Sequence, residues 1–216
     1  MRLHKNEVGL SAHDLSDHLS CSHLTMLELA VARGHQKAPV WVDPGLEALQ
    51  QRGFEHEAAY LTQLREAGLG ITEIPDSIPL KEAFEQTRSA MLAGTEIISQ
   101  AVLSDGRWLG RADVLQRVPL DSNLGSWAYE AVETKLARDA RPGAILQLCL
   151  YSEMVADIQG ISPEYIHIVS PGTGYEAKSF RLSDFQAYYR YIKRNLITVV
   201  DGADDQGEIS TYPDPV

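Results

Sequence analysis

Three charged residues in the middle of the sequence have a spacing that could support chemistry on a phosphate. Asp113 lies in an apolar stretch, and Glu133 and Lys135 stand two residues apart in the next such stretch. Two carboxylates brought together repel one another, and a divalent cation between them removes that cost. Oxygen ligands suit Mg²⁺ or Mn²⁺. Alternate residues of a strand share a face, so Lys135 would lie beside Glu133, where an ammonium can orient water and stabilise developing charge.

A simpler interpretation of Glu133 and Lys135 stays open on these residues alone. Opposite charges two apart on a strand usually form a plain ion pair on a solvated face. The context favours chemistry, because Asp113 precedes the pair and a predicted helix with Gln147 and Tyr151 follows it. Residues four apart lie on one side of a helix, so these two side chains would face the same way.

The apolar pattern of the first half of the chain predicts helices over residues 11–33, 44–67 and 79–93. Ser11 fits an N-cap, with Asp14 three residues later as in a variant of the capping box.

The period then changes to that of strands. Residues 97–103 and 108–118 flank the tight-turn dipeptide Asp105-Gly106, which predicts a hairpin. A third strand is expected over residues 127–135. The remaining expected elements are a helix over 142–159, strands over 165–169 and 178–182, and a helix over 184–196 capped by Ser183.

This order of elements predicts one α/β (α+β) domain over residues 1–200. Residues 1–95 would form a mainly helical part and residues 96–200 the core. The acidic tail, residues 201–216, contains Gly and Pro and is expected to be poorly ordered.

The net charge, the apolar runs and the cysteines of the sequence indicate which partners and which compartment to expect. The 216 residues carry a net charge of −11, divided as −7 over residues 1–105, +1 over 106–200 and −5 over 201–216. The balanced middle is therefore compatible with a nucleic-acid partner. The sequence has neither an apolar run long enough to cross a membrane nor a signal-peptide pattern, so we expect a cytoplasmic protein without a membrane partner. Its two distant cysteines, Cys21 and Cys149, do not form a disulfide framework.

Four segments, taken in order, resemble motifs of the RecB-like nucleases of the PD-(D/E)XK superfamily. They are Arg-Gly-Phe-Glu-His-Glu at 52–57, Gly-Arg-Ala-Asp at 110–113, Val-Glu-Thr-Lys at 132–135 and Gln-Leu-Cys-Leu-Tyr at 147–151. The resemblance covers most of the chain and is strongest to the helicase-associated members. It implies a restriction-endonuclease-like core, in which helices flank a central mixed sheet.

The resemblance also implies roles for individual residues. The metal ligands would be His56, Asp113, Glu133 and the backbone carbonyl of Thr134. The catalytic residues would be Asp113, Glu133, Lys135, Gln147 and Tyr151. Glu55 or Glu57 could assist through a bound water.

The implied function is that of a metal-dependent deoxyribonuclease, a hydrolase that uses Mg²⁺ or Mn²⁺ in DNA repair, recombination or processing. Its partner would be DNA, as single strands or ends, with a helicase domain in the full-length protein. The alternative is an inactive module of the same fold that binds DNA or another protein within a larger helicase–nuclease.

One feature departs from the family pattern. Several RecB-type relatives hold an iron–sulfur cluster on one cysteine before the first motif and three near the C-terminus. Cys21 stands where the first would be, and we expect that the chain is truncated before the other three. One thiolate does not hold such a cluster, so we expect no iron–sulfur cluster, with Cys21 as an orphan ligand.

Overall fold

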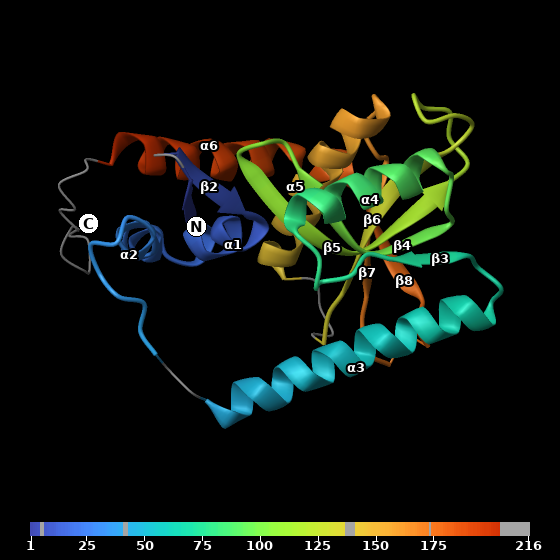
Figure 1. The fold of residues 1–216 in the computed structure, drawn as a ribbon, viewed down its shortest axis with the longest axis horizontal. Helices are drawn as coiled ribbons and strands as arrows, with labels where there is room; N and C mark the ends of the chain where they lie inside the picture. Colours follow the sequence, from blue (N-terminus) through green and yellow to red (C-terminus); the bar gives the residue numbers. More distant parts are fainter. Residues whose placement is uncertain (5–6, 41–42, 137–140, 173, 204–216) are drawn as a thin grey trace.

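A computed structural model describes residues 1–4, 7–40, 43–136, 141–172 and 174–203 (Figure 1). Within these ranges the chain is an α/β structure in which helices flank a mixed eight-stranded sheet. The strands are β1 (Arg2–His4), β2 (Glu7–Ser11), β3 (Ile71–Glu73), β4 (Ile97–Ser104), β5 (Trp108–Val118), β6 (Ala128–Thr134), β7 (Tyr165–Val169) and β8 (Ala177–Arg181). The helices are α1 (Ala12–Ser20), α2 (Ser22–Ala32), α3 (Pro44–Glu66), α4 (Leu80–Leu92), α5 (Pro142–Gln159) and α6 (Gln186–Gly202), with a 3₁₀ turn, η1, at Leu182–Asp184.

Strand β5 is the centre of the sheet. It pairs antiparallel with β4 along one edge. Along its other edge it pairs with two strands in succession: parallel with β2 up to Leu109, and antiparallel with β6 from Val114 onward. The sheet continues through β7, which is parallel to β6, to β8. Residues 110–113 therefore lie at a branch point, between the place where β2 ends its pairing and the place where β6 begins.

Two apolar clusters cover the two faces of the sheet. The larger one packs α1, α4, α5 and α6 against the strands, and includes Leu115 and Ala131. The smaller one packs Tyr60 and Leu61 of α3 against Val114, Val132 and other strand residues. In Figure 1, α3 runs along the opposite side of the sheet from α4, while α1, α2 and α6 gather beside β2. Of the helices that the structure describes, none is long and apolar enough to cross a membrane.

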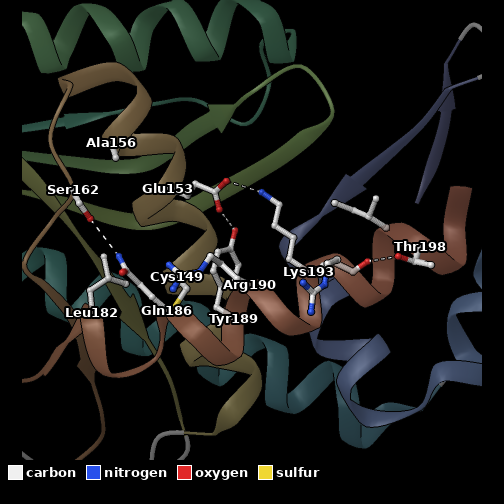
Figure 2. A pocket seen from close by; sticks show the side chains of 12 residues that line it. Cys149, Glu153, Ala156, Ser162, Leu182, Gln186, Tyr189, Arg190, Lys193 and Thr198 are labelled. Carbon is white, nitrogen blue, oxygen red and sulfur yellow. Dashed lines mark hydrogen bonds and ion pairs between the residues drawn. The ribbon is translucent and has the colours of Figure 1, made fainter.

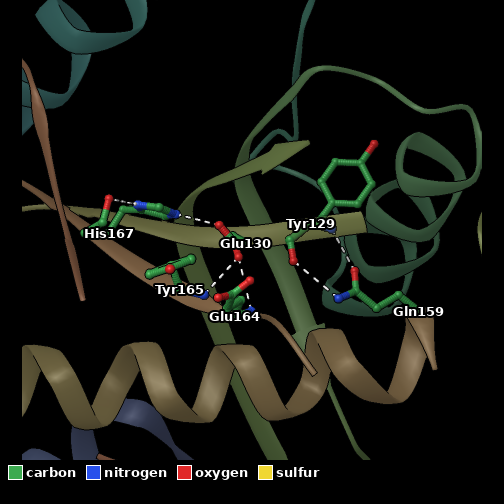
Figure 3. A network of polar contacts seen from close by, with 7 residues as sticks. Tyr129, Glu130, Gln159, Glu164, Tyr165 and His167 are labelled. Carbon is green, nitrogen blue, oxygen red and sulfur yellow. Dashed lines mark hydrogen bonds and ion pairs between the residues drawn. The ribbon is translucent and has the colours of Figure 1, made fainter. Parts of the chain in front are cut away.

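A polar network ties β6 to its neighbours, as Figure 3 shows. The Glu130 carboxylate accepts hydrogen bonds from the backbone N–H groups of Glu164 (3.1 Å) and Tyr165 (2.9 Å), and its Oε2 lies 2.8 Å from His167 Nε2. At the end of α5, Gln159 Oε1 accepts from the backbone N–H of Tyr129 at 2.8 Å. These satisfied buried groups hold α5 and β7 in place against β6.

A cavity of about 400 Å³ lies between helices α5 and α6, and polar contacts beside it connect the two helices (Figure 2). Glu153 accepts hydrogen bonds from the Tyr189 hydroxyl and from Lys193 Nζ, the latter at 2.9 Å. The Lys193 ammonium also lies 5.0 Å from the centre of the Trp108 ring, a cation–π arrangement that connects α6 to β5.

The structure confirms the hairpin, the third strand and the helix after it, and corrects other expectations. The helix expected over residues 11–33 is two helices, because Cys21 is extended (φ −163°, ψ 111°). The last helix begins at Gln186, after η1, so Ser183 is not its cap. It also includes Asp201 and Gly202 of the tail, and residues 204–216 lie outside the described residues. As expected at the start of α1, the Asp14 carboxylate accepts from the Ser11 backbone N–H at 2.7 Å.

Candidate active site

Asp113 and Glu133 come from neighbouring antiparallel strands. Val114 pairs with Val132, so the next position along the register sets Asp113 opposite Glu133. Asp113 Oδ2 accepts hydrogen bonds from the backbone N–H of Thr134 (2.7 Å) and from its hydroxyl (2.8 Å). Lys135 lies just beyond β6, with its Nζ 2.5 Å from Glu133 Oε1. The two carboxylates and the lysine expected from the sequence therefore lie together at the end of β6, with Asp113 contributed from the middle of β5.

The electrostatics of this group are dominated by burial. Glu133 is 4% exposed, and its Oε2 is buried without a hydrogen-bond partner among the described residues. Burial and then the charge of Asp113 raise the pKa of Glu133 to about 8. Burial also raises the pKa of Asp113, against the two hydrogen bonds from Thr134. Two carboxylates thus share one ammonium in a poorly solvated place, where added positive charge would be stabilising.

Burial lowers the pKa of the Lys135 ammonium, but the charge of Glu133, the hydrogen bond to Glu133 and the charge of Asp113 together outweigh burial, and the net pKa is raised. The lysine therefore stays protonated beside Glu133, and its side chain is only partly buried, at 37% exposure. A fixed cation beside a buried carboxylate pair is able to stabilise negative charge on a bound group.

Tyr151 of α5 lies close to the same carboxylates. It is 5% exposed, and burial followed by the charges of Glu133 and Asp113 raises the pKa of its hydroxyl well above its usual value. The ring packs on Gly110 of β5, where a Cβ atom would lie 3.0 Å from Cδ1 and closer still to Cε1. Gly110 is therefore required for the ring to reach this position.

Gln147, one turn earlier on α5, faces a different neighbour. Its Nε2 lies 3.4 Å from His13 Nδ1 of α1, and both residues line a pocket that also reaches Lys135. Gln147 and Lys135 thus line one pocket, and the Gln147 side chain contacts His13.

Helix α3 contributes His56 and Glu57 to the other side of the strand ends. The His56 ring stacks on Tyr175 with 5.5 Å between ring centres, and its Nε2 lies 3.4 Å from the carbonyl oxygen of Val169. That same carbonyl accepts from the backbone N–H of Lys135 at 3.0 Å. His56 therefore lies beside the end of β6, and its expected role as a metal ligand stays a prediction.

Glu57 of α3 is a carboxylate that interacts electrostatically with Asp113. Its Oε1 accepts from Gln100 Nε2 at 2.5 Å, and burial followed by the charge of Asp113 raises its pKa. Gln100 has φ 55°, an uncommon value for a residue with a side chain, and Arg111 Nη1 donates to its carbonyl at 3.1 Å. Strained positions of this kind often occur at functional sites. The sequence indicated Glu57 as one of two carboxylates, with Glu55, that could assist through a bound water.

The described side chains provide few ligands for a metal ion. Among the described residues, no three His, Cys, Asp or Glu side chains form a group that could hold a metal ion. Two opposed carboxylates, one with a buried oxygen that lacks a partner, nevertheless fit Mg²⁺, which proteins often bind through one or two carboxylates together with water and substrate phosphates.

Comparison with known proteins adds no further assignment: no family model matches the chain, and none of the curated proteins matches it.

Proposed function

We propose that the chain is a metal-dependent deoxyribonuclease whose reaction centre is formed by Asp113, Glu133 and Lys135. The observation that carries this proposal is the buried pair of opposed carboxylates with the Lys135 ammonium 2.5 Å from Glu133. A plain surface ion pair does not account for it, because Glu133 is 4% exposed and its second oxygen has no partner among the described residues.

Each residue has a distinct task in this proposal. Asp113, oriented by the two hydrogen bonds from Thr134, and Glu133 would hold Mg²⁺ or Mn²⁺, with the Thr134 carbonyl and His56 as the further ligands expected from the sequence. The bound cation would supply a Lewis acid that activates water towards a phosphodiester. Lys135 donates hydrogen bonds to the phosphate oxygens as their charge increases, and Tyr151 presents a protonated hydroxyl from α5.

The order of elements supports a RecB-like member of the PD-(D/E)XK superfamily. The Asp113 strand and the Glu133 strand form an antiparallel pair, α5 follows with Gln147 and Tyr151, and β7 returns parallel to β6. In this proposal the substrate is DNA, as single strands or ends, and a helicase domain is the partner in a longer protein.

The test is cleavage of a labelled single-stranded DNA by the purified chain with Mg²⁺, with Mn²⁺ and with a chelator. We expect cleavage that requires the metal and that falls at least about 100-fold in Asp113→Asn. Asn preserves the shape of the side chain and its contact with Thr134 while removing the charge. Asp76→Asn, at an exposed position before α4, is the matched control and should cleave at the wild-type rate.

Two results would count against the proposal in different ways. Equal cleavage by wild type and Asp113→Asn would remove the site assignment. DNA binding without cleavage in either metal would favour the alternative, an inactive module of a larger helicase–nuclease.

A further inference from the structure

A pocket of about 550 Å³ opens between α1 and the start of α5. Its polar lining consists of His13, Ser16, Ser20, Lys135, Arg141 and Gln147. The walls approach closely because residue 143 is glycine: a Cβ there would lie 2.9 Å from Ser16 Oγ, which donates to the Gly143 carbonyl at 3.3 Å. The pocket is thus a feature of the packing between two helices distant in sequence.

The charge of this pocket contrasts with that of the chain. The chain carries a net charge of −11, yet none of the described lining residues is Asp or Glu, and two of them, Lys135 and Arg141, are cations. His13 and Gln147 add hydrogen-bonding groups. Lysine, arginine and neutral donors together are the set that proteins use to hold the phosphates of a nucleic-acid backbone.

The pocket is continuous with the candidate active site. Lys135 belongs to both, because its ammonium contacts Glu133 and its side chain also lines the pocket. Gln147 lines the same pocket and lies 3.4 Å from His13. A phosphate held by Arg141 and His13 would therefore be next to the phosphate that approaches Lys135.

A second, apolar pocket of about 240 Å³ lies on the other side of Pro142, which lines both. Its wall contains the rings of Phe180, Phe185 and Tyr188. The Phe180 and Phe185 rings meet edge to face with 6.2 Å between centres, and Tyr188 is 51% exposed. Aromatic side chains beside a basic track are typical of single-strand binding, because an unpaired base can stack on them.

We propose that the pocket between α1 and α5 holds the phosphodiester backbone next to the bond to be cut, and that the aromatic pocket beyond Pro142 stacks an unpaired base. Arg141 and His13 are positioning residues for the strand, and Tyr188 is the stacking residue. This inference rests on the proposed function and explains how that function would select single-stranded DNA.

The test measures binding separately from cleavage. The dissociation constant of a labelled single-stranded oligonucleotide is measured by fluorescence anisotropy in a chelator, over a range of salt concentrations. Arg141→Ala should weaken binding about 10-fold and reduce the salt dependence by about one phosphate contact. Arg88→Ala, an exposed arginine of α4, is the matched control and should leave binding unchanged.

The stacking residue has its own variants. Tyr188→Ala should weaken single-strand binding about 10-fold, Tyr188→Phe should retain it, and neither should alter binding of a duplex of the same sequence. Wild-type affinity in Arg141→Ala, or equal losses in Arg141→Ala and Arg88→Ala, would overturn the phosphate pocket, as would undetectable binding by the wild-type chain at low salt. Equal effects of Tyr188→Ala on single strands and duplexes would overturn the stacking role. A wild-type chain that binds in this manner but does not cleave would contradict only the proposed nuclease activity.

Discussion

The ring of Tyr151 lies directly on the backbone of Gly110, in space that any side chain at position 110 would occupy. The contact joins α5 to the stretch of β5 between its pairings with β2 and β6. It thereby places the tyrosine hydroxyl near the Asp113 and Glu133 carboxylates, and burial, followed by the charges of these two groups, raises its pKa. Two residues 41 positions apart thus depend on one another for the geometry of the candidate site.

Gly110→Ala should therefore destabilise the protein and reduce cleavage. The added Cβ forces Tyr151 or β5 to move, and overpacking of this kind costs about 1–3 kcal/mol in the free energy of unfolding, measured by urea denaturation. Gly53→Ala in α3 is the matched control. A Cβ there meets nothing within 4 Å, so the substitution should increase the free energy of unfolding by about 0.5–1 kcal/mol. The double variant Gly110→Ala/Tyr151→Ala should lose less free energy of unfolding than the sum of the two single losses, because the smaller residue at 151 leaves room for the added Cβ. Strict additivity would contradict the contact.

Tyr151→Phe should separate the hydroxyl from the packing of the ring. The ring still fills the space over Gly110, so the free energy of unfolding should change by less than about 1 kcal/mol. Cleavage should fall about 10-fold or more, because the protonated hydroxyl near the carboxylates is lost. Tyr189→Phe is the control, and it should change stability without changing the cleavage rate. It removes a hydrogen bond to Glu153 between α5 and α6, so the free energy of unfolding should fall by about 1 kcal/mol while the cleavage rate stays unchanged. Wild-type cleavage by Tyr151→Phe would limit the residue to a packing role.

The stability of the protein should fall as the pH rises from about 4.5 to about 7, in part because of Glu28 of α2. Burial, and then the charges of Asp17 and Asp14, raise the pKa of Glu28 from 4.5 to about 7. In this range the unfolded chain has lost the proton that the folded chain still binds, so rising pH favours unfolding until the folded pKa is passed. Glu28→Gln should weaken this dependence and increase the free energy of unfolding at pH 8 by about 1 kcal/mol. Glu66→Gln, on the exposed end of α3, should show the wild-type dependence, and a slope in Glu28→Gln equal to that of wild type would contradict the assignment.

The two thiols should differ in reactivity. Cys149 is 2% exposed, and burial followed by the charge of Glu153 raises its pKa to about 12, so it should react with a thiol reagent only after unfolding. Cys21, which is partly exposed, should react in the native protein, and Cys21→Ser should abolish that fast reaction. Protein purified without oxygen should lack the visible absorbance of an iron–sulfur cluster, since one thiolate does not hold one. Fast labelling of Cys21→Ser, or a cluster spectrum, would contradict these expectations.

Local sequence patterns were sufficient to predict the central strands β4 and β5. The short strands β2 and β3 were not predicted, because they are defined by pairing with other parts of the chain. The Asp105-Gly106 turn and the alternation around it were sufficient to predict β4 and β5. Strand β3 is only three residues long, and it is defined by pairing with β4 at Ile71 and Ile97 rather than by its own pattern. Strand β2 pairs locally with β1, and it joins the rest of the sheet through the distant Trp108, the partner of Leu10.

The site shows the same division. The spacing of Glu133 and Lys135 and the apolar setting of Asp113 were visible in the sequence, because neighbouring strands bring such residues together. The proximity of Glu57 to Asp113 depends on how α3 lies against the sheet. The pocket at His13 and Gln147 depends on the packing of α1 on α5. No local pattern encodes either relationship.

The most direct test of the account is the initial rate of Mn²⁺-dependent cleavage of single-stranded DNA by Lys135→Ala. Lys135 is the ammonium beside the buried carboxylate pair, so its removal should lower the rate at least about 100-fold while the circular dichroism spectrum stays that of the wild type. Lys81→Ala, at an exposed position on α4, should cleave at the wild-type rate. Equal rates for wild type and Lys135→Ala would contradict the proposal that Asp113, Glu133 and Lys135 form the reaction centre.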